Sequence, residues 1–225
     1  MERMSTGIIG LDEHIEGGFP APSLILVKGT PGAGKTTFGV QSLFFGAQKG
    51  QVGVYITGIS EPVPVMKRYL SCYDFYQEAF IRDGHIQFWD LGETISKQGV
   101  DGALGAMRQI VSSHRPKRVV VDPLTPRYFF DNARDYRKFL SAFFNELRNQ
   151  NILTMVIGEK ECGDLIGLEE YLADGVISLE TVNLEGNPMV FKNVMRICKM
   201  RGTNHVRNLL SVELTKQGMK VDRLV

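Results

Sequence analysis

The sequence lacks the features of a secreted or membrane-embedded chain. Its 225 residues include only three cysteines, Cys72, Cys162 and Cys198, and no CxxC pair. An odd and scattered set argues against a disulfide framework or a structural zinc site and suits a reducing compartment. No apolar run approaches the roughly 20 residues of a membrane-spanning helix, and the first residues lack the basic and then apolar order of a signal peptide. We therefore expect a cytoplasmic protein without a membrane span.

An excess of charge of either sign is also missing. Lys and Arg number 26 and Asp and Glu number 25, so no overall positive field attracts nucleic acid or an anionic membrane. Low-complexity stretches, Pro-rich linkers and internal repeats are not visible, and the length fits one large α/β domain. We predict that residues 1–225 form a single domain. Its basic residues are concentrated near the end, where residues 188–225 contain eight Lys or Arg against Glu213 and Asp222.

Short apolar runs alternate along the chain with longer segments whose apolar residues recur at helical spacing. Runs of this kind are typical of strands buried on both faces. The alternation predicts an α/β fold with a mainly parallel, twisted central sheet flanked by helices, which binds ligands at the carboxyl ends of its strands. The predicted strands are 24–27, 52–56, 86–89, 118–121 and 152–157, and the predicted helices are 35–48, 63–73, 100–113 and 133–149.

Beyond Ala173 the pattern changes. Three strand-like runs, 175–179, 189–200 and 209–214, follow one another without long helices between them. Strands joined in this way usually pair antiparallel, because a parallel connection needs a long crossover. We therefore predict a C-terminal antiparallel β extension of the parallel sheet.

The segment between the first predicted strand and the first predicted helix carries the strongest motif. It reads Gly29-Thr30-Pro31-Gly32-Ala33-Gly34-Lys35-Thr36, a complete P-loop in its expected context. The glycines let the backbone turn its N–H groups towards phosphate oxygens at the positive end of the following helix. Lys35 adds a cation at the β- and γ-phosphates, the Thr36 hydroxyl is placed to ligate Mg²⁺, and Thr37 can contact the α-phosphate. The motif therefore predicts a binding site for ATP with magnesium.

A magnesium ion needs a further oxygen ligand beside Thr36, and an acidic residue at the end of a neighbouring buried strand suits that role. Asp122 directly follows the predicted strand 118–121. The alternative is a strand-terminal Asp that caps the turn before Pro123. The presence of a complete P-loop favours the metal role.

Motifs at both ends of the chain make a more specific resemblance. The opening reads Ser5-Thr6-Gly7-Ile8-Ile9-Gly10-Leu11-Asp12-Glu13 and then Gly17-Gly18-Phe19-Pro20. Towards the far end stand Tyr171-Leu172-Ala173-Asp174-Gly175-Val176-Ile177 and Lys199-Met200-Arg201-Gly202-Thr203-Asn204-His205. With the P-loop between them, these motifs resemble KaiC-type domains of the RecA superfamily over nearly the whole chain. The clock protein that names the family carries two such domains, whereas this chain carries one.

The resemblance implies a RecA-like P-loop fold and a mode of assembly. KaiC-type domains form homo-oligomers head to tail, usually hexameric rings, and hold ATP between the P-loop of one protomer and residues of the next. Carried over, Lys199 and Arg201 are basic fingers that reach the γ-phosphate of the neighbour's ATP. Met200, Thr203 and His205 line the same pocket, and Ser71 matches a position near the base in the same protomer.

Pattern alone leaves an alternative for these residues. Charge builds on the phosphoryl oxygens during transfer, so a cation supplied by a partner accelerates hydrolysis, and Lys199 and Arg201 project to the same side of a strand. They would also fit the solvated face of an antiparallel strand, with Cys198 and Met200 pointing inside. His205 would then be an ordinary loop histidine.

The chain departs from the family where the catalytic carboxylates are expected. After the second strand, active KaiC-type domains usually carry two adjacent glutamates, one of which orients or deprotonates the attacking water. Here an ungapped alignment puts Ile59 and Ser60 at these positions, and one inserted residue makes the pair Ser60-Glu61. A general base contributes about 10² to 10⁴ in rate, so slow hydrolysis is expected. Glu61 remains the candidate catalytic residue, and Glu159, after the fifth strand, is a possible sensor or substitute.

Three classes of function follow. The first is a ring-forming, magnesium-dependent ATPase with weak activity, with autokinase activity as a variant in which Ser or Thr residues near Thr125 or Thr203 accept phosphate. The second is a hydrolysis-deficient, nucleotide-gated scaffold that acts on a protein partner, as the related FlaH proteins of the archaeal motility machinery do. The third is a DNA recombinase, and it fits least. The segment 159–164 that would face a ring channel is acidic and lacks the basic and aromatic residues that bind single strands.

Overall fold

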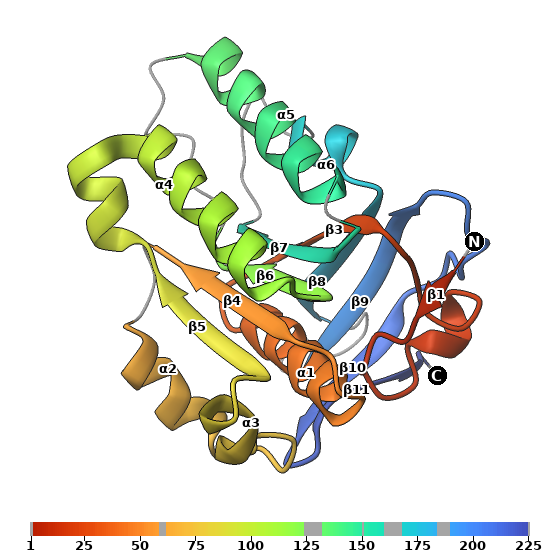
Figure 1. Cartoon of the computed structure of the whole chain (residues 1–225). Coiled ribbons are helices and arrows are strands. Elements are labelled where there is room, and N and C mark those ends of the chain that lie inside the picture. The colour runs from red at the N-terminus through yellow and green to blue at the C-terminus, as the bar shows by residue number, and fades with distance from the viewer. Residues whose placement is uncertain are drawn as a thin grey trace.

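A computed structural model of the chain describes residues 2–58, 62–123, 132–149, 151–159, 168–183 and 190–224. A nine-stranded sheet forms its centre, with helices on both faces (Figure 1). Its strands are β3 (Ser23–Gly29), β4 (Gly53–Thr57), β5 (Ile86–Asp90), β6 (Arg118–Val121), β7 (Leu153–Glu159), β8 (Gly175–Asn183), β9 (Phe191–Met200), β10 (Leu210–Thr215) and β11 (Gly218–Arg223). The helices are α1 (Lys35–Gln48), α2 (Val63–Leu70), α3 (Glu78–Arg82), α4 (Gly92–His114), α5 (Ala133–Asn149) and α6 (Leu168–Leu172). A two-stranded sheet of β1 (Arg3–Met4) and β2 (Phe19–Pro20) and a short 3₁₀ helix, η1 (Asp12–His14), complete the N-terminal segment.

The large sheet has the order β11-β10-β9-β8-β3-β7-β6-β4-β5. The strands from β8 to β5 in this order are parallel, and β9, β10 and β11 continue the sheet in antiparallel pairs. The prediction of a mainly parallel sheet with a C-terminal antiparallel extension is confirmed. Because β3 lies in the middle of the sheet, the loop that follows it opens at the centre of the edge formed by the carboxyl ends of the strands.

The two faces of the sheet are covered by different helices, as the two-residue period of a strand requires. Ile25 and Val27 of β3 face a buried cluster that contains α1. Leu24 and Leu26 face the other cluster, which contains α4 and α5. Figure 1 shows α1 on one side of the strands and α4 and α5 on the other. No helix in the described parts of the chain is long and apolar enough to cross a bilayer.

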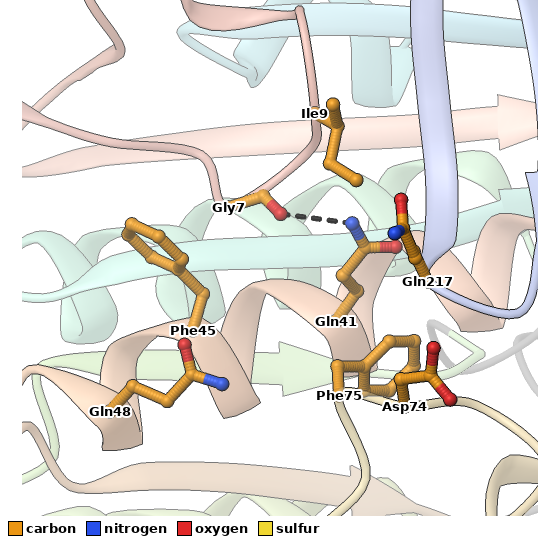
Figure 2. Close-up of a pocket in the computed structure, with 8 residues that line it drawn as sticks. All are labelled: Gly7, Ile9, Gln41, Phe45, Gln48, Asp74, Phe75 and Gln217. Carbon is orange, nitrogen blue, oxygen red and sulfur yellow. Dashed lines mark hydrogen bonds between the residues drawn. The ribbon is translucent and has the colours of Figure 1, made fainter.

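A buried glutamine attaches two distant segments to α1. The Gln41 side chain donates to the Gly7 carbonyl at 2.9 Å (Figure 2). It also donates to the Met219 carbonyl at 3.1 Å and accepts from the Met219 N–H at 2.6 Å. This side chain therefore satisfies three backbone groups outside α1, namely the two carbonyls and the Met219 N–H. The N-terminal segment and the β10–β11 hairpin are held against the helix that follows the P-loop.

A second anchor of the N-terminal segment is Arg118, which is 1% exposed. Its guanidinium donates to Gln51 Oε1, to Ser42 Oγ and to the Ser5 carbonyl at 2.8–2.9 Å. Burial lowers the pKa of Arg118 to about 10, and the charge of Asp12 opposes that shift. Arg118 is the first residue of β6, whose last residue precedes Asp122, so the same strand that anchors the N-terminal segment also positions the predicted metal ligand.

Several predicted boundaries need correction. The helix predicted at 63–73 ends at Leu70, and the one predicted at 100–113 belongs to α4, which starts at Gly92. Within α4 the backbone leaves helical geometry at Gly99, with φ 65° and ψ −163°, so the prediction found only the segment beyond this kink. The strand β11 was not predicted, because its polar sequence Gly218–Arg223 has no continuous apolar run.

Candidate functional site

The predicted phosphate-binding loop joins the centre of the sheet to the start of α1. Gly32 has φ 77° and Gly34, directly before the helix, has φ 91°. These left-handed conformations strain any side-chain-bearing residue, so glycine is required by geometry at both positions. The Phe38 N–H donates to the Gly34 carbonyl at 2.9 Å and closes the first turn of α1. In general, the first N–H groups of a helix have no partner within the helix, and an anion can pair with them.

The start of the loop is held by β8. The Thr30 N–H donates to the Leu179 carbonyl at 3.1 Å. A Cβ atom at Gly29 would lie 1.8 Å from the same carbonyl oxygen, so only glycine permits this approach. The Thr30 hydroxyl is buried and makes no hydrogen bond within the described residues. A buried polar atom of this kind costs about 1–3 kcal/mol, which is more typical of a ligand-binding loop than of an ordinary turn.

Lys35 extends over the loop. Its Nζ atom donates to the Gly29 carbonyl at 3.0 Å and to the Thr30 carbonyl at 2.9 Å. These bonds place the ammonium group at the start of the P-loop, with the loop backbone around it. The structure thus brings Gly29, Thr30 and Lys35 together.

Asp122 lies opposite the first turn of α1, at the end of β6. Its Oδ2 atom accepts from the Thr36 hydroxyl at 2.6 Å and from the Tyr55 hydroxyl at 2.7 Å. The residue is 6% exposed, and this burial raises the pKa of its carboxyl. The hydrogen bonds from Thr36 and Tyr55 and the charge of Lys35 oppose the shift without cancelling it. A positive ion beside the carboxylate would remove the cost of burying its charge.

The Thr36 and Asp122 oxygens are the kind of donor set that Mg²⁺ accepts. The ion prefers oxygen ligands, keeps several waters and is usually bound through one or two carboxylates together with substrate phosphates. The described residues contain no group of three or more His, Cys, Asp or Glu placed to hold a metal. Such a group is not needed if the phosphates complete the coordination. The residues present therefore fit a nucleotide-dependent magnesium site.

The sequence analysis missed Tyr55. It stands in the middle of a buried apolar strand, β4, where an aromatic residue is expected to pack, and its ring does lie against Phe88 with centroids 5.4 Å apart. The hydrogen bond from the Tyr55 hydroxyl to Asp122 becomes apparent only when the neighbouring strand is considered. β4 pairs with β6, and Tyr55 lies opposite Val120, two residues before Asp122.

The remaining residues predicted within the same protomer are only partly placed. Thr37 is the third residue of α1 and is partly buried. Ser71 follows α2 and is exposed, and its hydroxyl donates to the Arg68 carbonyl at 2.8 Å. Glu61 and Thr125 lie outside the described residues, as does most of the acidic segment 159–164. Glu159 ends β7 and pairs with Gly29, which places its backbone beside the P-loop.

The basic residues predicted to reach a neighbouring subunit, Lys199 and Arg201, lie at the edge of the sheet that the amino ends of the parallel strands form. Met200 at the end of β9 pairs with Gly175, and Gly175 pairs with Ile25 near the start of β3. A strand rises about 3.3 Å per residue, so Ile25 and Gly29 are separated by about 13 Å along β3. Arg201 lies one residue beyond Met200, still farther from the P-loop. The residues 199–201 therefore do not reach the phosphate-binding loop of their own protomer.

At this edge, Lys199 and Arg201 both contact residues 170–174, the last turn of α6 and the two residues before β8, which we call the α6–β8 junction. Lys199 Nζ donates to the carbonyls of Glu170, Tyr171 and Ala173 at 2.9, 3.1 and 2.6 Å. Arg201 donates to the Tyr171 carbonyl and to Asp174 Oδ1, at 3.2 Å in each case. The two cations thus lie on the same side, as predicted from their spacing.

The other members of the motif 199–205 have different surroundings. Met200 is 5% exposed and packs in the core of its own protomer. The Thr203 hydroxyl accepts from Arg3 Nη1 at 2.7 Å, and His205 Nδ1 lies 2.9 Å from the Val206 carbonyl oxygen. Thr203 and His205 are partly exposed. Within this motif, Lys199 and Arg201 therefore share the α6–β8 junction as a contact, whereas Gly202 and Thr203 share Arg3.

The alternative reading of β9 was wrong for Cys198. The pairing of β9 with β8 shifts by one residue, because Val176 lies opposite Lys199 and Ile177 opposite Ile197. Cys198 bulges out of the ladder and is exposed, while Ile197 and Met200 are buried. A β-bulge of this kind changes which side chains face the core, so the simple alternation assumed from the sequence does not hold here.

A separate cavity of about 270 Å³ lies on the outer face of α1 (Figure 2). The N-terminal segment, the stretch after α2 and the β10–β11 turn meet there. Among the described residues, its lining is Gly7, Ile9, Gln41, Phe45, Gln48, Asp74, Phe75 and Gln217. None of these was predicted to bind nucleotide, so the cavity is distinct from the P-loop site.

Comparison with known proteins agrees with the motifs. The family model described as “ATPase: KaiC” matches residues 4–224. A UPF0273 protein of Methanopyrus kandleri is 31% identical over 99% of this chain and 92% of its own length. The circadian clock oscillator protein KaiC of Parathermosynechococcus lividus is 28% identical over 97% of this chain, which spans 42% of that protein.

A solved structure extends the likeness to the fold. The crystal structure of a KaiC-like protein from the hyperthermophilic archaeon Pyrococcus horikoshii OT3 is similar with a TM-score of 0.85 and 30% identity, and the match covers 98% of each chain. The predicted RecA-like α/β fold is thereby confirmed. With a family match over nearly all of its length, the chain belongs to the KaiC ATPase family.

Proposed function

We propose that this protein binds ATP with magnesium at the P-loop and assembles head to tail into a homo-oligomeric ring, as a hexamer, with one nucleotide at each subunit interface. Gly29 to Thr37 hold the phosphates, Thr36 and Asp122 hold the ion, and Arg201 of each subunit approaches the nucleotide of the next. Membership of an ATPase family implies nucleotide binding. The ring, the ion and the residue roles are parts of the proposal.

The observation that carries the proposal is the separation of the two halves of the site. The P-loop opens at the edge that the carboxyl ends of the parallel strands form. Arg201 lies at the edge formed by their amino ends, and at least five residues of β3 separate the two along the strand. A cation so placed acts on a phosphate only in another subunit. A surface that meets a different surface of an identical subunit is heterologous, and its repetition gives a ring when the rotation between subunits closes.

Hydrolysis in this ring is expected to be slow. The chain lacks the usual pair of glutamates after the second strand and carries Ile59, Ser60 and Glu61 there. A general base contributes about 10² to 10⁴ in rate, so its displacement leaves an ATPase that turns over slowly. The same departure favours a second candidate, a scaffold that uses bound ATP to control assembly with a protein partner. The two differ in whether phosphate is released on the time scale of assembly.

Three variants test the proposal in two assays, light scattering with and without ATP and Mg²⁺, and phosphate release. Lys35→Ala removes a charge-assisted hydrogen bond worth about 1.5–3 kcal/mol, so nucleotide affinity should fall about 10- to 150-fold. Arg201→Ala should bind nucleotide normally as a protomer and lose ATP-dependent assembly and turnover. Arg196→Ala, an exposed arginine on the same strand, should behave as wild type.

The outcomes separate the parts of the proposal. If Arg201→Ala assembles and releases phosphate like Arg196→Ala, the arginine is not supplied to a neighbour and the interface site is wrong. ATP-dependent assembly without measurable phosphate release identifies the scaffold rather than the slow ATPase.

A further inference from the structure

One carboxylate oxygen of Asp122 accepts hydrogen bonds from two different parts of the fold. The Thr36 hydroxyl, on α1, donates to Oδ2 at 2.6 Å, and the Tyr55 hydroxyl, on β4, donates to the same atom at 2.7 Å. Thr36 is partly exposed, whereas Tyr55 is 1% exposed. The hydrogen bond from Tyr55 therefore comes from the core of the protein rather than from the P-loop.

The pairing of two strands explains how Tyr55 reaches Asp122. β4 and β6 are parallel, and Tyr55 lies opposite Val120. The Asp122 N–H donates to the Ile56 carbonyl at 2.9 Å, so the ladder continues as far as Asp122. Side chains two residues apart along a strand point to the same face, which makes Tyr55 and Asp122 diagonal neighbours on that face. Two residues of rise and one spacing between strands separate such neighbours by about 8 Å. A tyrosine hydroxyl spans this distance, and the short side chains of serine and threonine do not.

The surroundings of the Tyr55 ring leave its hydroxyl little freedom. The ring is buried in the cluster that covers the α1 face of the sheet, and it lies against Phe88 with centroids 5.4 Å apart. A tyrosine side chain has only two torsions between the backbone and the ring. The backbone of β4 and the packing of the core therefore set the position of the hydroxyl, and Asp122 is bonded to a rigid part of the protein.

A nearby cation attracts the same carboxylate. The Lys35 ammonium group donates to the carbonyls of Gly29 and Thr30. Burial raises the pKa of the Asp122 carboxyl, and the charge of Lys35 is one of the influences that oppose this shift, so the two groups attract each other. Such attraction is stronger in a buried environment than in water. A carboxylate drawn to Lys35 would neutralise the cation proposed to bind phosphate and would also be lost as a metal ligand.

We infer that Tyr55 is a positioning residue: its hydroxyl holds the Asp122 carboxylate beside Thr36 and away from Lys35, and thereby raises the affinity of the nucleotide-loaded site for Mg²⁺. The inference rests on the proposed function, because it concerns how the residues proposed to hold the ion are arranged. It adds to the P-loop and β6 a residue of β4 that has no proposed contact with the nucleotide.

Removal of one hydroxyl tests this role. Tyr55→Phe keeps the ring that packs against Phe88 and removes the donor to Asp122. The probe is adenylyl imidodiphosphate, a non-hydrolysable ATP analogue, whose affinity is measured in EDTA and over a series of Mg²⁺ concentrations. Groups that hydrogen-bond to metal ligands typically contribute about 10- to 100-fold to metal affinity. We expect Tyr55→Phe to raise the Mg²⁺ concentration at half-maximal effect about tenfold and to leave the affinity in EDTA unchanged.

The Mg²⁺ dependence is a readout that a merely structural role does not move, because a general loosening of the P-loop lowers nucleotide affinity equally with and without the ion. Equal losses in the two conditions, or a wild-type Mg²⁺ midpoint, would overturn the inference. In the Asp122→Asn background, Tyr55→Phe should not shift the midpoint any further. A further shift of about tenfold there would mean that Tyr55 acts independently of Asp122, which also overturns the inference.

Two further variants complete the experiment. Tyr76→Phe is the matched control, since the Tyr76 hydroxyl also donates to a carboxylate, that of Glu78, at 2.7 Å, but lies outside the proposed site. It should resemble wild type. Asp122→Asn alone separates the inference from the proposed function. If Asp122→Asn keeps the wild-type response to Mg²⁺, the proposed metal site is wrong and the inference fails with it. If Asp122→Asn loses this response while Tyr55→Phe keeps it, only the inference fails.

Discussion

At the scale of single residues, Asp122 shows how a proposed metal-binding position lowers the stability of the protein without its ligand. Its carboxyl is buried between Thr36 and Tyr55, and burial raises its pKa. The folded protein therefore binds the proton more tightly than the unfolded chain does. By linkage, the contribution of this group to the free energy of unfolding decreases as pH rises from the unfolded pKa of about 3.8 through the raised folded value.

Asp122→Asn removes the charge and nearly preserves the shape. In the absence of nucleotide the variant should be more stable than wild type above the folded pKa of Asp122, and this advantage should disappear as pH falls to about 4. With ATP and Mg²⁺ the order should reverse, because only wild type gains binding energy from the ion. Urea unfolding at several pH values, with and without ligand, measures both effects. A variant that is less stable than wild type at neutral pH without ligand would contradict the assignment.

The site residues differ in how far sequence alone reveals them. Gly32 and Gly34 are predictable because the P-loop motif requires positive φ at glycine, and the structure shows it there. Asp122 is predictable from its place after a buried strand. Tyr55 was missed because an aromatic residue in an apolar strand looks like core, and its hydroxyl finds Asp122 only through the pairing of β4 with β6.

At the scale of elements, α1 follows the phosphate-binding loop and holds the N-terminal segment and the β10–β11 hairpin. These two segments contain strands that were hardest to predict. The bounds of α1, 35–48, were predicted correctly because strong motifs mark its start and an apolar pattern marks its length. The bulge at Cys198 was not predictable, since it depends on the register between two strands rather than on either sequence alone. The small strands β1 and β2 were missed because each has two residues, too few to show a period.

Gln41 carries the attachment of these elements to α1, and its replacement gives a test. Gln41→Leu should lower the free energy of unfolding by about 2–4 kcal/mol, because a buried N–H and two buried carbonyls lose their partner. Gln48→Leu changes an exposed glutamine on the same helix and should stay within about 0.5 kcal/mol of wild type. Chemical denaturation of both variants makes the comparison. Equal effects would mean that Gln41 does not hold the N-terminal segment and the β10–β11 hairpin to α1.

At the scale of the whole molecule, the arrangement of the proposed half-sites makes complementation between defective subunits possible. Lys35→Ala subunits lack a working P-loop and keep Arg201, while Arg201→Ala subunits have the opposite defect. Suppose that an active interface takes its P-loop from one subunit and its arginine from the next. In a random mixture of equal amounts, the first subunit has an intact P-loop in half of the interfaces and the second has an intact arginine in half. Both groups are then intact in about a quarter of the interfaces.

This fraction does not depend on the number of subunits in the ring, so the prediction holds for a hexamer and for any other closed ring. Co-refolded mixtures of the two variants should recover about a quarter of wild-type turnover, although each variant alone is nearly inactive. A mixture of Lys35→Ala with wild type should retain about half, since only the P-loop is then lost. If each subunit instead used its own arginine, the mixture of defective variants would remain as inactive as its parts. Recovery is therefore the direct signature of a site that two copies of this chain build together.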